Sequence, residues 1–328
     1  MLTGKQTWVY DKQPVIISSA AVGGPFEAQG NLAQDFDILN DDIWMGQKSF
    51  EKAEKKLLEQ ACETAISKAG LQKEDIQFFI SGDLINQIVP SSFTARTLSI
   101  PYFGIYGACS SSMEGLALAA LFISSGFASK VLVGTSSHNA AAEKQYRYPT
   151  EYGAQKPPTA QWTVTGAGAA LLSDSGTGPR VVAATIGRVV DMGTSDPFNM
   201  GAAMAPAAVD TLETHFRELG VDASHYDIIA TGDLGKLGHR IASDLLTQRG
   251  IDIPSDKFTD CGMLVYKPDQ PVFSGGSGCA CAAVVTFGHF MNRLKKGELK
   301  RILVIATGAL LSPMSYQQKE TIPCIAHA

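Results

Sequence analysis

The sequence predicts an α/β protein whose two halves repeat one arrangement of helices and buried strands. The segments "SKAGLQKEDIQFFISGDL" and "RELGVDASHYDIIATGDL" match at a constant offset, since Gly70 corresponds to Gly220 and Gly82 to Gly232. The residues before each glycine, 53–70 and 207–220, show helical apolar spacing. A glycine that ends such a helix is typical of a C-cap. The apolar run that follows is continuous, as in strands of a sheet covered by helices.

A second repeat follows in each half. The run "CSSSMEGLALAALFISSGFASKVLVGTSS" contains small residues, an apolar helix, a glycine, a basic residue and a strand. The run that begins "GSGCACAAVVTFGHF" has the same order, and Gly297 and Arg301 take the places of Gly126 and Lys130. We therefore expect one pseudo-symmetric body with its site between the halves. The turn cluster at 173–180 predicts the join, which gives halves of residues 1–175 and 176–328.

The composition narrows the class of protein. The chain has 328 residues, of which 45 % are hydrophobic and 18 % charged, a balance typical of a globular protein with a sizeable core. The net charge of −5 indicates no basic face, so we expect no nucleic-acid partner. The cysteines do not suggest a disulfide framework in a chain of this length, and they favour a reducing compartment. They are Cys62, Cys109, Cys261, Cys279, Cys281 and Cys324.

No segment has the pattern of a membrane anchor. The first residues, "MLTGKQTWVYDKQPVIISS", carry charges and lack the continuous apolar region of a signal peptide. The longest apolar runs, "LALAALFI" and "ILVIATGALL", are about half of the ~20 residues that a span needs. We therefore expect a soluble protein on the cytoplasmic side, which could associate with a membrane only peripherally.

Cys109 is the candidate nucleophile. It lies in "GACSSSMEG", where small neighbours allow a ligand to approach the backbone closely. A helix that begins just after it would place amide N–H groups near the sulfur, which predicts a lowered thiol pKa. The alternative is a small buried cysteine packed at a helix start. Cys279 and Cys281 have no second pair at zinc spacing, so we expect neither a metal nor a cofactor.

Three motifs resemble one enzyme superfamily. "GACSSSMEGLALAA" is similar to the nucleophile loop and helix of the thiolases and β-ketoacyl synthases. "TVTGAGAALLSD" and "SGGSGCACAAVVTF" are similar to that superfamily's glycine-containing strand turn and its C-terminal loop. The resemblance implies a thiolase-like five-layer fold of two βαβαβαββ halves. It also implies a homodimer that pairs through the strand "IPYFGIYGA".

A closer resemblance is to the stage V sporulation protein AD family of spore-forming Firmicutes. It rests on "SSHNAAAEKQYRYPTEYGAQKP", "DPFNMGAAMAPAA", "GGSGCAC" and "ATGALLSPMSYQQKETIPCIAHA". The resemblance implies binding of dipicolinic acid, with or without calcium, for its uptake into the forespore. It further implies membrane proteins of the same operon as partners, and a peripheral position at the spore inner membrane.

The residues that would activate Cys109 are missing at the expected positions. Type III condensing enzymes place a histidine after the second-half strand and an asparagine in the C-terminal glycine loop, where both stabilise the oxyanion. The corresponding stretches here offer Gly232 and Gly276, with Asp233 and Ser277 beside them. His239 lies several residues beyond, and His289 lies in a helical context. The resemblance thus implies a vestigial nucleophile, or a pocket wall, rather than a condensing enzyme.

Two alternatives stay open: an active acyltransferase that uses Cys109 with other helpers, and a structural partner of a membrane channel. For an aromatic dicarboxylate, we expect cations and aromatic rings from the loop 136–157 and contacts from the glycine-rich loop. The competing interpretation is that each polar residue of the loop is simply solvated, and Asp83 and Asp233 have the pattern of turn caps at strand ends. The expected ligand contacts are His138, Lys144, Arg147, Tyr148, Lys156, Gly276, Ser277, Cys279 and Cys281.

Overall fold

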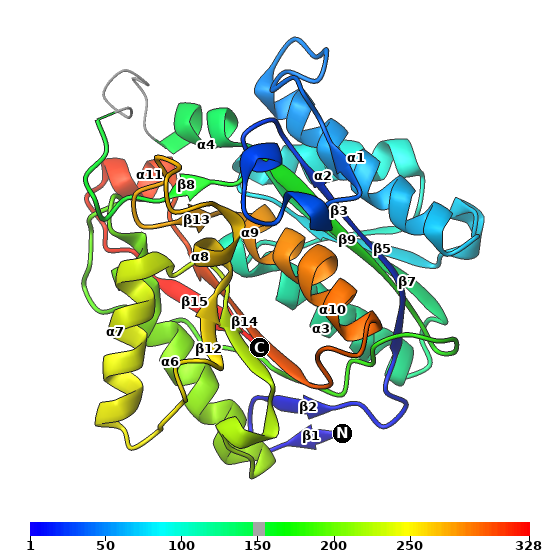
Figure 1. Ribbon diagram of the computed structural model, residues 1–328. Coiled ribbons are helices and arrows are strands. Elements are labelled where there is room, and N and C mark those ends of the chain that lie inside the picture. Colours follow the sequence, from blue (N-terminus) through cyan, green and yellow to red (C-terminus); the bar gives the residue numbers. More distant parts are fainter. Residues whose placement is uncertain (147–154) are drawn as a thin grey trace.

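A computed structural model describes residues 1–146 and 155–328. Within these residues, two main sheets alternate with three layers of helices (Figure 1). The larger sheet has the strand order β4-β3-β9-β7-β5-β6. Its strands are Ile38–Leu39 (β4), Val15–Gly23 (β3), Gly166–Ser173 (β9), Lys130–Ser137 (β7), Phe78–Gly82 (β5) and Tyr102–Gly104 (β6). β9 runs antiparallel to both of its neighbours, and the other pairs are parallel.

The second sheet has the strand order β12-β11-β14-β15. Its strands are Phe258–Asp260 (β12), Ile228–Thr231 (β11), Ile302–Ala309 (β14) and Cys324–His327 (β15). The first three are parallel and β15 is antiparallel, so this sheet resembles part of the first one. The described residues also form two small sheets, β1-β2-β10 and β8-β13. Their strands are Leu2–Thr3 (β1), Thr7–Val9 (β2), Ala183–Thr185 (β10), Trp162–Thr163 (β8) and Gly276–Ser277 (β13).

Helices cover the outer face of each main sheet. α1 (Phe50–Lys68) packs on β3, β7 and β9, with α2 (Val89–Leu98) at its side. α6 (Met200–Leu219) packs on β14 and β15, with α7 (Gly235–Gln248) beside it. The remaining short helices are α4 (Asn139–Tyr146), α8 (Cys261–Val265) and α11 (Pro313–Gln317).

The middle layer lies between the two sheets and consists of two helical segments. α3 (Ser111–Ser124) contacts strands of both main sheets. The other segment begins with α9 (Cys279–Val284), continues through a π-helical stretch, Val285–Phe290, and ends with α10 (Met291–Lys295). Small residues are frequent in α3 and α9, which lets these helices approach the sheets closely. The N-terminal part of α9 contacts the turn that precedes α3, which brings the two cysteine motifs together.

The expected internal repeat is present in the structure. α1 begins at Phe50 and α6 at Met200, and each ends before a glycine in the left-handed region, Gly70 with φ 67° and Gly220 with φ 66°. A side chain there would be strained, so these glycines end the helices. The predicted five-layer α/β fold with repeated halves is therefore confirmed.

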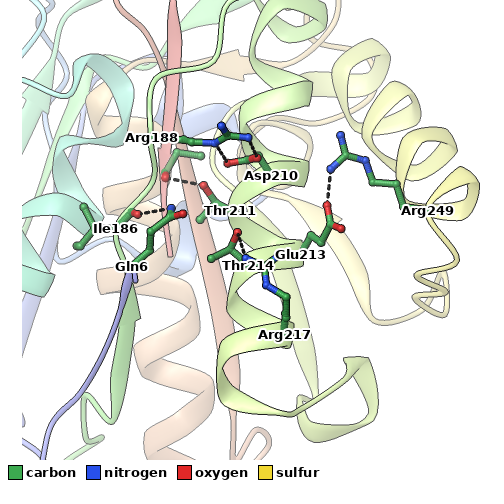
Figure 2. A network of polar contacts seen from close by, with 10 residues as sticks. Gln6, Ile186, Arg188, Asp210, Thr211, Glu213, Thr214, Arg217 and Arg249 are labelled. Carbon is green, nitrogen blue, oxygen red and sulfur yellow. Dashed lines mark hydrogen bonds and ion pairs between the residues drawn. The ribbon is translucent and has the colours of Figure 1, made fainter. Parts of the chain in front are cut away.

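Polar contacts anchor α6 to its surroundings (Figure 2). Arg188 donates from Nε and Nη2 to the two carboxylate oxygens of Asp210, at 2.9 and 2.6 Å. Thr211 donates to the Ala326 carbonyl of β15, and Glu213 pairs with Arg249 at the end of α7. Such bidentate pairs add geometric specificity. They hold α6 in register against the edge of the second sheet.

Candidate functional site

The Cys109 turn is built by its small neighbours. Cys109 lies in a 3-10 turn, Ala108–Ser110, directly before α3. Ser111 Oγ accepts the Gly107 N–H at 3.1 Å and donates to the Ala108 carbonyl at 2.8 Å. Ala108 has φ 49°, an uncommon backbone for a residue other than glycine. The serines of the motif therefore hold a strained turn that presents Cys109 between the two halves.

The thiol of Cys109 is not activated. Burial raises the pKa of Cys109 well above its usual value, and the Asp233 carboxylate and the Cys279 thiol raise it further. The expectation of a lowered pKa is therefore wrong. The helix dipole acts in the favourable direction, but for a buried thiol beside a carboxylate the cost of ionisation exceeds what a helix start contributes.

Asp233 is the buried partner of Cys109. Its carboxylate accepts hydrogen bonds from Thr307 Oγ1 at 2.7 Å, from Ser277 Oγ at 2.9 Å and from the Gly278 N–H at 3.0 Å. The Cys109 thiol lies within hydrogen-bonding reach of the same carboxylate. Burial raises the pKa of Asp233 to about 6, although these donors favour the ionised form. Asp233 is thus more than a turn cap, because it joins the two halves at the thiol.

The two glycines at the expected activator positions have packing roles. A Cβ on Gly232 would lie 2.8 Å from the Thr307 backbone nitrogen, so a larger residue does not fit there. A Cβ on Gly276 would lie 3.3 Å from the Tyr266 ring. The side chains that face the thiol come from the neighbouring positions, Asp233 and Ser277. The sequence indicated that the activating side chains are missing at the two glycines. It did not indicate that the neighbouring Asp233 reaches the thiol.

A cavity opens at Cys109 and encloses about 520 Å³ of empty space, including solvent at its mouth. Its walls are mostly apolar, with a few hydroxyl groups and the thiol. Among the residues that the structure describes, none that lines it carries a charge. The lining residues are Leu84, Cys109, Ala142, Tyr146, Thr163, Pro197, Met200, Ser277, Ala309 and Leu311. Apolar walls with a few convergent polar groups are typical of small-molecule sites.

The remaining cysteine and glycine candidates lie behind the cavity wall. Cys279 is fully buried and its thiol donates to the Ala108 carbonyl at 2.9 Å. Cys281 is also buried, and its thiol lies 3.5 Å from the Gly232 carbonyl. Burial raises the pKa of both thiols. Of the glycine-loop candidates, only Ser277 reaches the cavity surface.

His138 does not lie in an exposed polar loop, which corrects the expectation from its polar neighbours: it is the single residue between β7 and α4. It follows directly on β7, is fully buried, and its ring packs 5.2 Å from the ring of Phe50. Its Nε2 lies 2.9 Å from the Ile43 carbonyl. Burial lowers the pKa of His138, so the ring is neutral and has a structural role.

The segment 136–157 was expected to be a loop, but β7 extends to Ser137 and α4 occupies Asn139–Tyr146. Its two described lysines lie in ion pairs. The Lys144 ammonium lies 2.7 Å from Glu51 on an exposed part of α4. The Lys156 ammonium lies 2.6 Å from Glu143 and over the ring of Trp162. Neither lysine lines the cavity. Arg147 and Tyr148 lie outside the described residues.

The five layers and the buried cysteine between two repeated halves define the fold class of the thiolase-like condensing enzymes. The fold is similar to 3-oxoacyl-(acyl carrier protein) synthase III from Aquifex aeolicus, with a TM-score of 0.59 and 15 % identity over 96 % of this chain and 99 % of that one. It is equally similar to a variant of OleA from Xanthomonas campestris, with a TM-score of 0.59 and 15 % identity over 98 % and 99 % of the two chains.

Within this fold class, the chain belongs to the stage V sporulation protein AD family, whose sequence model matches residues 4–328. It is 51 % identical to stage V sporulation protein AD of Bacillus subtilis (strain 168) over 326 residues, which cover 99 % of this chain and 96 % of the relative. The chain is therefore a sporulation protein on a thiolase-like fold, as its motifs suggested.

Proposed function

We propose that this protein binds dipicolinic acid in the cavity at Cys109, as a step in its uptake into the forespore, and that it catalyses no condensation. The observation that carries the proposal is the pairing of Cys109 with Asp233. The position of the nucleophile is kept, but burial holds the proton on the thiol, and the group that it faces is a carboxylate, whose charge opposes a thiolate and which offers no hydrogen-bond donor to an oxyanion. Without an activated nucleophile, a cavity that in related folds holds an acyl group can bind a ligand without reacting with it.

The walls of the cavity suit the ring of dipicolinate. Leu84, Met200 and Leu311 supply aliphatic surface, and Tyr146 adds an aromatic side chain. Tyr146 Oη donates to the Leu84 carbonyl at 2.6 Å, which fixes the phenol at the wall. A planar aromatic ligand buried against such residues gains contact area at low conformational cost.

The carboxylates of dipicolinate need a counter-charge that the described lining residues do not supply. Two sources are available within the proposal. Arg147 follows Tyr146 directly in the sequence, and a guanidinium binds a carboxylate through two parallel hydrogen bonds. Calcium bound by the ligand would also neutralise the two carboxylates before they enter an apolar cavity.

We also propose that the protein associates peripherally with the spore inner membrane, beside membrane proteins of the same operon. No helix within residues 1–146 and 155–328 has the length and apolar character to cross a bilayer. The partner proteins would then hold this protein at the membrane. We also propose a homodimer, for which β6 supplies an exposed sheet edge.

Titration calorimetry with dipicolinate tests the proposal. We expect saturable binding with one ligand per chain. Pyridine-2-carboxylate, which lacks one carboxylate, should bind about tenfold to a hundredfold more weakly if each carboxylate makes a charge-assisted hydrogen bond. Absence of dipicolinate binding, with and without calcium, would overturn the proposal.

A further inference from the structure

A second and larger concave surface lies at the opposite end of the second sheet. It encloses about 2150 Å³ of empty space, open to solvent, between β2, the loop before β10, the end of α6 and the start of β14. We call it the basal groove; β2, which contributes Val9 to it, is drawn near the N-terminus in Figure 1. β14 runs from Ile302 in the groove to Ala309 in the Cys109 cavity, a rise of roughly 23 Å at about 3.3 Å per residue.

The charge of the groove is opposite to that of the protein. Arg180, Lys295, Lys300 and Arg301 line it, and no described aspartate or glutamate does, although the chain has a net charge of −5. None of these four side chains forms an ion pair within the described residues. Within the described part of the chain, the Arg180 side chain donates to the Gln13 carbonyl, at 3.2 Å, and to no other group. A concave surface that gathers unpaired cations attracts anions and raises their local concentration.

The backbone that carries two of these cations is fixed. The Asp227 carboxylate accepts the N–H groups of Lys300 and Arg301 at 2.6 and 3.0 Å. The side chains of both residues are exposed, and neither forms an ion pair with Asp227 among the described residues, although the Lys300 charge contributes to lowering the pKa of that carboxyl. The groove therefore presents cations from a rigid edge, which lowers the entropy lost when an anion binds.

The floor of the groove is apolar. Val182 is 52 % exposed although it lies beside β10, and Leu219, Val221 and Leu294 are partly exposed around it. Below them, His215 contacts Tyr226 Oη at 2.7 Å and Thr185 Oγ1 at 2.7 Å, so the buried polar groups of the floor are already satisfied. A ligand thus meets aliphatic surface at the floor and positive charge at the rim.

We propose that the basal groove binds an extended segment of a partner protein in which acidic side chains alternate with aliphatic ones. The groove is open to solvent and encloses about four times the empty space of the Cys109 cavity, so an extended stretch of polypeptide can lie along it. A planar anionic membrane would touch the rim of a concave surface and leave its apolar floor uncovered. An acidic amphipathic segment satisfies both the rim and the floor.

Fluorescence anisotropy at low salt tests this with a short labelled peptide that repeats Glu-Leu-Ser. We expect binding to the intact protein, and a loss of about tenfold or more in the double variant Lys300→Glu/Arg301→Glu, since rim charges govern encounter. Arg180→Glu, on the other wall, is the second variant if the first does not fold. Lys48→Glu/Lys52→Glu is the control: it changes the net charge equally at exposed positions outside the groove and should bind normally.

Three results would overturn the proposal. The first is no binding of the Glu-Leu-Ser peptide, including the case in which vesicles with anionic lipids bind instead. The second is equal binding of a Glu-Ser-Ser peptide, which would make the groove a site for any polyanion. The third is equal binding by the groove variants and the control. Dipicolinate titration of the same variants keeps the two sites separate, because the groove substitutions should leave that affinity unchanged.

Discussion

The Cys109 thiol and the Asp233 carboxylate lie within hydrogen-bonding reach of each other at the boundary of the two halves. A condensing enzyme needs a thiolate at this position and donors for the oxyanion that forms from the thioester. Here the neighbouring group is an acceptor that already binds Thr307, Ser277 and Gly278. Burial, together with the charge of this carboxylate, raises the pKa of the thiol and keeps the proton on sulfur, so the cavity is better suited to binding than to condensation.

The first prediction is that the protein forms no condensation product from acyl-CoA and malonyl-carrier protein. Removing one oxyanion donor costs about 10²–10³ in rate, and both usual activators are absent here in addition to the raised thiol pKa. Product should be followed by mass spectrometry, with Cys109→Ala as the control. Turnover that disappears in Cys109→Ala would instead establish an acyltransferase.

The second prediction concerns the volume of the cavity. Cys109→Ala should keep most dipicolinate binding, because alanine leaves the wall in place and adds only a little space. Cys109→Leu should weaken binding strongly, because a larger side chain fills the cavity at its base. Cys109→Asp should also weaken it, because it places a second carboxyl beside Asp233.

Calorimetry of the three Cys109 variants should be read together with their circular dichroism and melting temperature. Equal loss in all three folded proteins would show that the sulfur itself is required. Unchanged binding in Cys109→Leu would place the ligand outside this cavity.

The repeated halves could be predicted from sequence because they depend on local patterns at a constant spacing. Helix periodicity, glycine caps and continuous apolar strands are all properties of neighbouring residues, and the offset between Gly70 and Gly220 reveals the duplication. The position of Asp233 could not be read in this way. Which of several adjacent residues reaches Cys109 depends on how β11 and the glycine-rich loop pack, and Gly232 turns out to face the Thr307 backbone.

His138 and the loop lysines show a second limit. Polar neighbours made His138 look like a loop residue, but β7 ends beneath α1, and the packing of Phe50 against the ring buries it. Lys144 and Lys156 looked available for an anion because their partners, Glu51 and Glu143, are not adjacent to them in sequence. Ion pairs between distant segments leave no signal in composition.

A third prediction concerns assembly through β6. This strand is the edge of the six-stranded sheet, and Phe103 on it is 43 % exposed. An uncovered edge with an aromatic side chain favours pairing with another strand. Phe103→Glu should convert the expected dimer to a monomer in light scattering after size exclusion.

The matched control for the dimer is Phe127→Glu. Phe127 is 79 % exposed but lies in the turn after α3, outside the strand. It should leave the mass unchanged. A wild-type monomer at micromolar concentration, or a dimer that persists in Phe103→Glu, would contradict pairing through this edge.

The fourth prediction uses the buried carboxyl of Glu27. Burial raises its pKa to about 7, and its Oε1 accepts from the Thr165 N–H at 3.0 Å and from Tyr266 Oη at 2.5 Å. The folded state therefore holds this proton up to a higher pH than the unfolded state. The free energy of unfolding loses about 1 kcal/mol from this group as the pH rises from 6 to 8.

Glu27→Gln should lack that loss, since glutamine cannot ionise. Urea unfolding at both pH values should show the variant gaining stability relative to the wild type by about 1 kcal/mol between pH 6 and 8. Glu74→Gln, at an exposed position, is the control. A difference between variant and wild type that does not change with pH would show that Glu27 is not protonated in this range.

The last prediction asks which cation of the segment 136–157 contacts dipicolinate. Lys144→Ala should leave the dissociation constant unchanged, because its ammonium pairs with Glu51 and does not line the cavity. Arg147→Ala should weaken binding tenfold to a hundredfold if the arginine holds a carboxylate, since a charge-assisted hydrogen bond contributes about 1.5–3 kcal/mol. Arg147→Lys should recover only part of the affinity, because lysine lacks the bidentate fork. If Arg147→Ala binds as well as Lys144→Ala, the counter-charge must come from calcium, and chelation with EGTA should then abolish binding by the wild type.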